Sequence, residues 1–195
     1  MKIILLGNSN IGKSSILYYY EHKKRNFYDT ITIGVDKYET NVNITNKKNM
    51  KTTIKVQIWD TAGQELYNSI ISLYYKYSMG VLLVFDLTNK KSFMDLSKWI
   101  KQILNNSDIK REHILLIGNK VDKLEDRVIS FDDAHKFMRD NKLCGYIETS
   151  AHTGYNINFI FSKLVQEIYN TKDIIEHNYI NINTKEKWYN KYCCN

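Results

Sequence analysis

The residues best suited to chemistry lie in the first fourteen positions of the chain. A short apolar run, Ile3 to Leu6, ends at Gly7, and Gly12-Lys13-Ser14 follows just before a helix-compatible stretch. This is the G-x-x-x-x-G-K-[ST] spacing of a phosphate-binding loop between a strand and a helix. Glycines let successive backbone N–H groups point at a polyphosphate, near the positive end of the helix dipole. The Lys13 ammonium can reach terminal phosphates and the Ser14 hydroxyl can ligate Mg²⁺, so the motif predicts nucleotide binding.

The segments after this loop alternate between strand-like and helix-like patterns. Residues 35–44 and 52–59 have nearly alternating apolar and polar residues and predict a hairpin with one buried face. Buried strands are expected at Val81 to Phe85 and Ile114 to Ile117, and a last strand at Gly145 to Thr149. Strands that alternate with helices predict a doubly wound α/β sheet, whose ligand lies outside the carboxyl ends of the strands. The polar motifs of the chain fall at such ends.

Capping residues and apolar periodicity predict where the helices lie. One is expected from about Ser14 to Glu21, and Ser92 and Ser130 are the expected N-caps of the next two. The last helix presents one apolar face, made of Ile157, Ile160, Phe161, Leu164 and Ile168. Beyond about residue 170 the core pattern fades. We therefore expect one domain over residues 1–170 and a flexible tail over 171–195.

Composition excludes several classes of protein. The chain has 195 residues, 43% hydrophobic and 25% charged, which is typical of one soluble globular domain. Its formal net charge is +7, but Lys and Arg are scattered, so no nucleic-acid partner is expected. The longest apolar stretches fall far short of the roughly 20 residues of a membrane span. Three cysteines make no disulfide framework, which favours a reducing compartment.

Five motifs in a fixed order carry a resemblance to a known family. They are GNSNIGKS, Thr32-Ile-Gly, WDTAGQE, GNKVD and ETSA, and over about residues 1 to 170 the chain resembles the Ras superfamily of small GTPases. The TIGVD and WDTAGQE motifs, together with a C-terminal Cys-Cys, are similar to those of the Rab branch. The resemblance implies a GTP hydrolase that uses GTP or GDP and Mg²⁺. It also implies a mostly parallel six-stranded sheet with one antiparallel edge strand and helices on both faces.

The GNKVD motif predicts guanine as the base. The Asp122 carboxylate can accept hydrogen bonds from the ring N–H and the exocyclic amine of guanine. Adenine lacks both donors on that edge, and a buried carboxylate left unpaired costs several kcal/mol. The Lys120 stem can lie over the base, and Asn119 can tie this loop to the phosphate loop. In the family, the backbone of Ser150 and Ala151 completes the base pocket.

The resemblance also implies the residues of the metal site and of catalysis. Asp60 would act on Mg²⁺ through water, and the Thr32 hydroxyl would join Ser14 on the metal. Gly63 would offer a backbone N–H to the γ-phosphate. Gln64 matches the glutamine that orients the attacking water, and it is the expected catalytic residue. No arginine for the transition-state charge is evident in the chain, so turnover is expected to be slow without a GTPase-activating protein.

Two positions of the base pocket depart from the family pattern. Arg25 stands where the family has an aromatic residue that stacks on guanine, although a guanidinium can itself stack on a ring. His152 replaces the usual lysine after Ser-Ala. The complete set of expected nucleotide-binding residues is Ser9, Asn10, Ile11, Gly12, Lys13, Ser14, Ser15, Arg25, Thr32, Gly63, Asn119, Lys120, Asp122, Ser150, Ala151 and His152.

The end of the chain, Cys193-Cys194-Asn195, resembles one of the Rab double-cysteine termini. Geranylgeranylation of both cysteines would anchor the protein stably, since one lipid chain binds membranes only marginally. The alternative is two free thiols on a flexible tail. By resemblance we expect a monomeric, cytoplasmic protein that cycles onto the cytosolic face of an intracellular membrane.

The resemblance also implies the partners of a vesicle-traffic switch. These are a guanine-nucleotide exchange factor, a GTPase-activating protein, effectors, and prenylation escort and dissociation-inhibitor proteins. Two other functions stay open on the sequence. One is a nucleotide-bound interaction scaffold with negligible hydrolysis. The other is a phosphate-loop kinase or ATPase, which the Asp122 motif disfavours.

Overall fold

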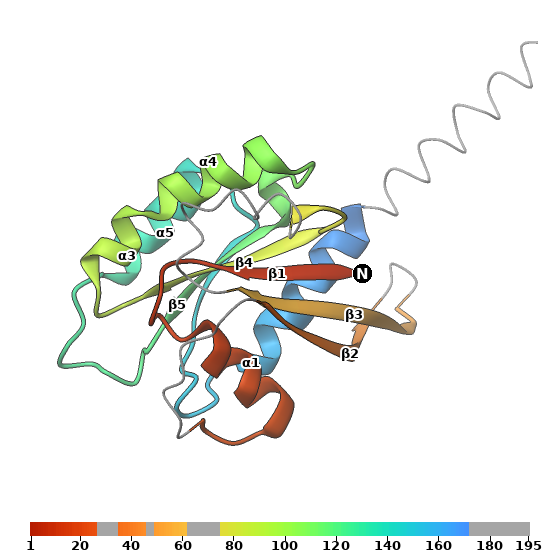
Figure 1. The fold of residues 1–195 in the computed structure, drawn as a ribbon, viewed down its shortest axis with the longest axis horizontal. Helices are drawn as coiled ribbons and strands as arrows, with labels where there is room; N and C mark the ends of the chain where they lie inside the picture. The colour runs from red at the N-terminus through yellow and green to blue at the C-terminus, as the bar shows by residue number, and fades with distance from the viewer. Residues whose placement is uncertain (27–34, 46–48, 62–74, 172–195) are drawn as a thin grey trace, which may run out of the picture.

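The strands in the described part of the chain form one sheet (Figure 1). The structure is a computed structural model, and it describes residues 1–26, 35–45, 49–61 and 75–171. The strands are β1 (Lys2–Leu6), β2 (Val35–Thr45), β3 (Lys51–Thr61), β4 (Gly80–Asp86), β5 (Ile114–Asn119) and β6 (Gly145–Glu148). They make a six-stranded sheet in the order β2-β3-β1-β4-β5-β6. Only the β2–β3 pair is antiparallel within these strands, which confirms the predicted fold.

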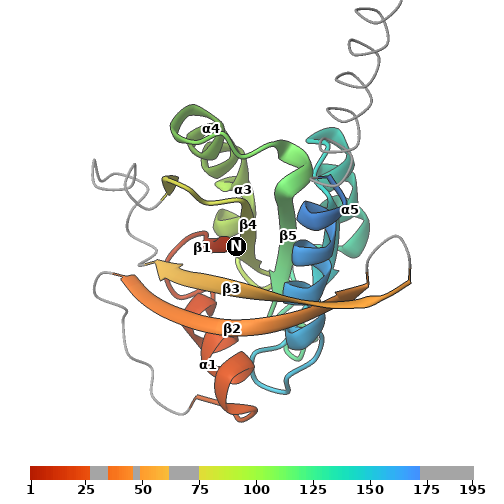
Figure 2. The ribbon, with the colours of Figure 1, turned by 90° about the vertical axis from the view of Figure 1, so that its right-hand side faces the viewer.

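Helices cover both faces of this sheet (Figures 1 and 2). The helices among the described residues are α1 (Lys13–His22), α3 (Lys90–Met94), α4 (Leu96–Asn106), α5 (Phe131–Asp140) and a helix at 157–171, with a 3₁₀ turn at Arg111–His113. Ile3 and Leu5 of β1 pack with α1 and the helix at 157–171, and Ile4 and Leu6 pack with α4 and α5. Because both faces are covered, the inner strands β1 and β4 are apolar almost throughout.

The predicted hairpin is present as β2 and β3. Their register runs from Val35 opposite Thr61 to Thr45 opposite Lys51. Val42, Ile44, Val56 and Ile58 belong to the buried core, so the hairpin has one buried face, as the alternation predicts. At the end of β3, the Thr61 hydroxyl donates to the carbonyl oxygen of Leu5 at 2.8 Å. This bond fixes the end of the hairpin beside the end of β1.

Of the two predicted N-cap residues, Ser130 is confirmed and Ser92 is wrong. Ser130 is the N-cap of α5, and its hydroxyl accepts from the amide of Asp133 at 3.0 Å. Ser92 is not a cap: Asn89 is the N-cap of α3, and its side chain accepts from the Ser92 amide at 3.2 Å. Asn and Ser cap with similar preference, so composition alone does not decide between two candidates three residues apart.

The last helix presents the five predicted residues to the core. Thr171 is still helical, and residues 172–195, which hold nearly all of the predicted tail, lie outside the described residues. Among the residues that the structure describes, none of the helices combines the length and the apolar character that crossing a bilayer requires.

Candidate functional site

The phosphate-loop motif joins β1 to α1 in the backbone geometry that it needs. Gly7, Asn10 and Gly12 have φ angles of 137°, 62° and 94°, a region open to glycine and tolerated by Asn. Lys13, the first residue of α1, is 5% exposed, and its Nζ donates to the carbonyl oxygens of Gly7 and Asn8, each at 2.9 Å. A buried ammonium at a helix N-terminus is well placed to bind phosphate oxygens.

Asp60, next to the last residue of β3, lies beside this loop. Its side chain is buried, and Oδ1 has no hydrogen-bond partner among the described residues. Burial raises the pKa of Asp60 above its usual value, whereas the hydrogen bond with Ser14 and the charge of Lys13 lower it. An unpartnered carboxylate oxygen near a hydroxyl suits a hard cation such as Mg²⁺. The residues present therefore fit Mg²⁺.

Asn119, the last residue of β5, connects three segments of the chain. Its Nδ2 donates to the carbonyl oxygen of Ile11 at 2.8 Å. Its Oδ1 accepts from the amide of Ala151 at 3.2 Å and from the hydroxyl of Thr149 at 3.3 Å. Asn119 is only 1% exposed, so these bonds are shielded from water. The expected tie between the GNKVD loop and the phosphate loop is therefore present.

A cavity of about 260 Å³ lies between the loops that Asn119 joins. Its lining residues are Gly12, Ser15, Arg25, Asn26, Asn119, Lys120, Asp122, Lys123, Ala151 and His152. Asn26 and Lys123 are the two members that the sequence did not single out. The cavity runs from the start of α1 to Asp122, so a ligand in it can contact both the phosphate loop and the Asp122 carboxylate.

The two residues that depart from the family pattern meet at the wall of this cavity. Nη1 of Arg25 lies 3.4 Å from Nε2 of His152, and Nδ1 of His152 lies 3.8 Å from Oδ2 of Asp122. The arrangement places a guanidinium and an imidazole, both able to stack on a base, next to the carboxylate expected to bind guanine.

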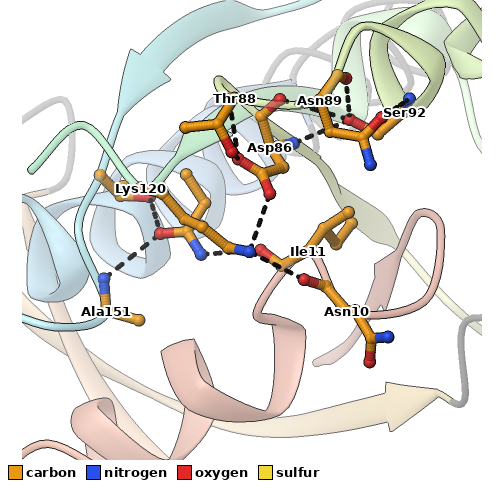
Figure 3. A network of polar contacts seen from close by, with 10 residues as sticks. Asn10, Ile11, Asp86, Thr88, Asn89, Ser92, Lys120 and Ala151 are labelled. Carbon is orange, nitrogen blue, oxygen red and sulfur yellow. Dashed lines mark hydrogen bonds and ion pairs between the residues drawn. The ribbon is translucent and has the colours of Figure 1, made fainter. Parts of the chain in front are cut away.

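Asp86, at the end of β4, is a functional residue that sequence reasoning missed (Figure 3). Its Oδ2 lies 2.8 Å from Nζ of Lys120, which also donates to the carbonyl oxygen of Asn10 at 2.9 Å. Its Oδ1 accepts from the amide and the hydroxyl of Thr88, each at 2.8 Å. Asp86 is 4% exposed, so Lys120 is paired with a buried carboxylate. The available signal was an acidic residue directly after the apolar run of β4.

The remaining expected residues divide into two groups. Ser9 lies in the phosphate loop, and the Ser150 hydroxyl accepts from the amides of His152 at 3.2 Å and Thr153 at 3.0 Å, which shapes the loop after β6. Five expected residues lie outside the described residues, namely Thr32, Gly63, Gln64, Cys193 and Cys194. Their roles stay predictions.

Three features of the site occur together in guanine-nucleotide-binding proteins of the small GTPase fold. They are a phosphate loop after the first strand, a buried aspartate at the end of β3 and an Asn-Lys-Val-Asp loop after β5. Comparison with known proteins supports the same class of protein. The model of the Ras family matches residues 2–170. The chain therefore belongs to the Ras family, whose members are GTP hydrolases.

Several curated relatives carry Rab or Ypt names. The chain is 39% identical over 168 residues to GTP-binding protein ypt3 of Schizosaccharomyces pombe, a match that covers 86% of this chain and 75% of that protein. It is 38% identical over 168 residues to Ras-related protein Rab-11A of Dictyostelium discoideum, with 86% and 75% covered. It is 37% identical over 169 residues to Ras-related protein Rab11A of Lotus japonicus, with 87% and 72% covered. Within the Ras family, the chain is thus similar to Rab proteins.

Proposed function

We propose that this protein is a Rab-type switch in vesicle traffic, which binds GDP and GTP with Mg²⁺ and hydrolyses GTP slowly. The observation that carries the proposal is the set of contacts that the Asn119 side chain makes. Its side chain joins the phosphate loop to the loops after β5 and β6 and so forms one cavity between the start of α1 and Asp122. A nucleotide needs this combination, because its phosphates and its base must be held at once.

Several described residues of the site have a specific role in this proposal. Lys13 and the amides at the start of α1 bind the phosphates, Asp122 binds the guanine edge, and Arg25 stacks on the base. Ser14 and Asp60 would hold Mg²⁺, which when bound supplies positive charge beside the β- and γ-phosphates.

The switch itself would depend on residues outside the described part of the chain. Thr32 would join the metal, Gly63 would donate to the γ-phosphate, and Gln64 would orient the attacking water. Loss of the γ-phosphate would release both segments. We propose that this change is what an exchange factor, an activating protein and effectors recognise.

Membrane recruitment is proposed to occur through Cys193 and Cys194, each carrying a geranylgeranyl group. Escort and dissociation-inhibitor proteins would then carry the lipidated chain between the cytosol and an intracellular membrane. In vitro geranylgeranylation followed by intact-mass measurement tests this: two added groups are expected, and the Cys193→Ser/Cys194→Ser variant should gain none. An unmodified parent chain would contradict the lipid anchor.

The nucleotide that copurifies with the chain tests the central proposal, followed by its rate of conversion in a single turnover. We expect GDP or GTP, with slow hydrolysis that an activating protein accelerates by roughly 10³–10⁵ where it supplies an arginine. Gln64→Leu should retain GTP and hydrolyse it more slowly. Equal hydrolysis by parent and variant would favour the scaffold function, and copurifying ATP would contradict the site assignment.

A further inference from the structure

Asn8, in the phosphate loop, uses both ends of its side-chain amide in contacts with the junction of α3 and α4. Its Nδ2 donates to Oδ2 of Asp95 at 2.9 Å. Its Oδ1 accepts from Nε1 of Trp99 at 2.8 Å. An indole nitrogen only donates and an ionised carboxylate only accepts, so this pair of partners allows a single orientation of the amide.

The partners of Asn8 are themselves held firmly. Trp99 is completely buried in the core between the sheet and α4. Asp95 is 7% exposed and is the N-cap residue of α4, yet its carboxylate makes no capping bond to that helix. Instead it contacts Asn8 with one oxygen and Nζ of Lys98, at 2.6 Å, with the other. Both contacts lower the pKa of Asp95, with Lys98 the larger cause, so Asp95 is charged at neutral pH.

The backbone of Asn8 faces the phosphate site. Its carbonyl oxygen is one of the two that accept from Nζ of Lys13, at 2.9 Å. The side-chain amide and the carbonyl are separated by few rotatable bonds. The position of the amide therefore restricts the position of the carbonyl, and the carbonyl restricts Lys13.

We propose that Asn8 is a positioning residue through which Asp95 and Trp99 set the geometry of the phosphate loop, and with it the rate of GDP release. This inference rests on the proposed function, since it concerns the same nucleotide site. Asn8 does not touch the reacting atoms in this proposal. It acts through Lys13.

Exchanging the side-chain amide of Asn8 and the carboxylate of Asp95 tests the inference. Asn8→Asp alone sets two carboxylates against each other, whereas Asn8→Asp/Asp95→Asn restores one donor facing one carboxylate with the roles reversed. In both variants Nε1 of Trp99 can still donate to position 8. The full-length protein would be loaded with a fluorescent GDP analogue in Mg²⁺ buffer, and its dissociation followed in excess unlabelled GDP. Asn105→Asp, on the exposed side of α4, is the matched control for added charge.

We expect Asn8→Asp to release GDP about tenfold faster or more, because a hydrogen bond to a charged group is replaced by repulsion. The double variant should return to within about threefold of the parent, and Asn105→Asp should equal the parent. A double variant as fast as Asn8→Asp would overturn the inference, because added charge near the phosphates would then explain the effect without any tie. An Asn8→Asp variant with the parent's rate would overturn it as well.

Trp99→Phe provides a second test in case Asn8→Asp fails to fold. It removes the Nε1 donor and retains an aromatic ring in the core, and it should accelerate GDP release about threefold or more. Unchanged release from a folded Trp99→Phe variant would overturn the inference. A parent chain that binds no guanine nucleotide would instead overturn the proposed function, and the inference with it.

Discussion

The ammonium of Lys120 lies 2.8 Å from the carboxylate of Asp86, and this ion pair joins the ends of β5 and β4 beside the phosphate loop. Asp86 is held in turn by Thr88, so Lys120 extends from a fixed anchor toward the carbonyl of Asn10. Lys120 adopts a positive φ of 69°, which is uncommon for a lysine. The surrounding contacts stabilise this backbone, and they place the Lys120 stem at the wall of the base cavity.

Asp86→Asn should make Lys120 less firmly held and speed the release of GDP about tenfold, because the ion pair is replaced by a weaker hydrogen bond from the ammonium to a neutral amide oxygen. Dissociation of a fluorescent GDP analogue measures this, and the exposed Asp108→Asn serves as control. If Asp86→Asn releases GDP at the parent's rate, the pair does not position Lys120 for the base.

Gly12→Ala should abolish the tie between the phosphate loop and Asn119. A Cβ at Gly12 would lie 2.4 Å from Nδ2 of Asn119, and φ of 94° is unfavourable for alanine. We expect GDP affinity to fall at least tenfold while the core strands remain folded. Calorimetric titration with GDP, alongside circular dichroism, checks both parts.

Gly145→Ala is the matched control, since its Cβ would meet only the end of the Leu115 side chain, at 3.2 Å. It should bind GDP as the parent does. Normal GDP binding by Gly12→Ala would mean that the Asn119 tie is dispensable.

Asp122→Asn should change the base that the cavity accepts. The variant loses an acceptor for the two donors of guanine, so GDP affinity should fall by about a hundredfold or more. Xanthine has a carbonyl where guanine has its amine, so the side-chain amide introduced by the substitution can donate to it. Competition between GDP and xanthosine diphosphate is the measurement. A variant that prefers GDP as strongly as the parent would show that Asp122 does not contact the base.

Asp60→Asn should affect folding and ligand binding in opposite directions. The raised pKa of Asp60 means that its ionised form destabilises the folded state at neutral pH when no cation is bound. The neutral amide should therefore raise the unfolding temperature of nucleotide-free protein by about 2–4 °C for each kcal/mol gained. It should also weaken binding of a non-hydrolysable GTP analogue in Mg²⁺ but not in EDTA. Equal weakening in both buffers would argue against a metal role.

Most of the fold could be predicted because it follows from apolar runs and their spacing. The runs at 81–85 and 114–117 are long enough to identify buried strands, and the order of strands and helices then fixes a doubly wound sheet. Motif residues such as Lys13, Asn119 and Asp122 could also be placed, because their spacing to a glycine or a strand end is informative by itself.

Asp86, Asn8 and Trp99 could not be predicted as parts of the site. Asp86 and Trp99 belong to no spaced motif, and Asn8 stands at a variable position of the phosphate-loop motif. The partners of Asn8 lie 87 and 91 positions away in the sequence. Only the folded sheet, with β4 next to β1, brings the start of α4 to the phosphate loop. A single polar residue near a strand end has many possible partners in a sequence, and packing selects one of them.

The pairing of Val35 with Thr61 at the end of the hairpin has a mechanical consequence. In the sequence, residues 27–34 immediately precede Val35 and residues 62–74 immediately follow Thr61. Both segments are therefore connected to the same paired position of the β2–β3 hairpin. Eleven paired positions define the register of the hairpin, and a slip by one residue would turn every buried side chain outward. Val35 and Thr61 therefore cannot shift along each other unless this register changes. The Thr61 hydroxyl on Leu5 fastens that shared origin two positions before Gly7.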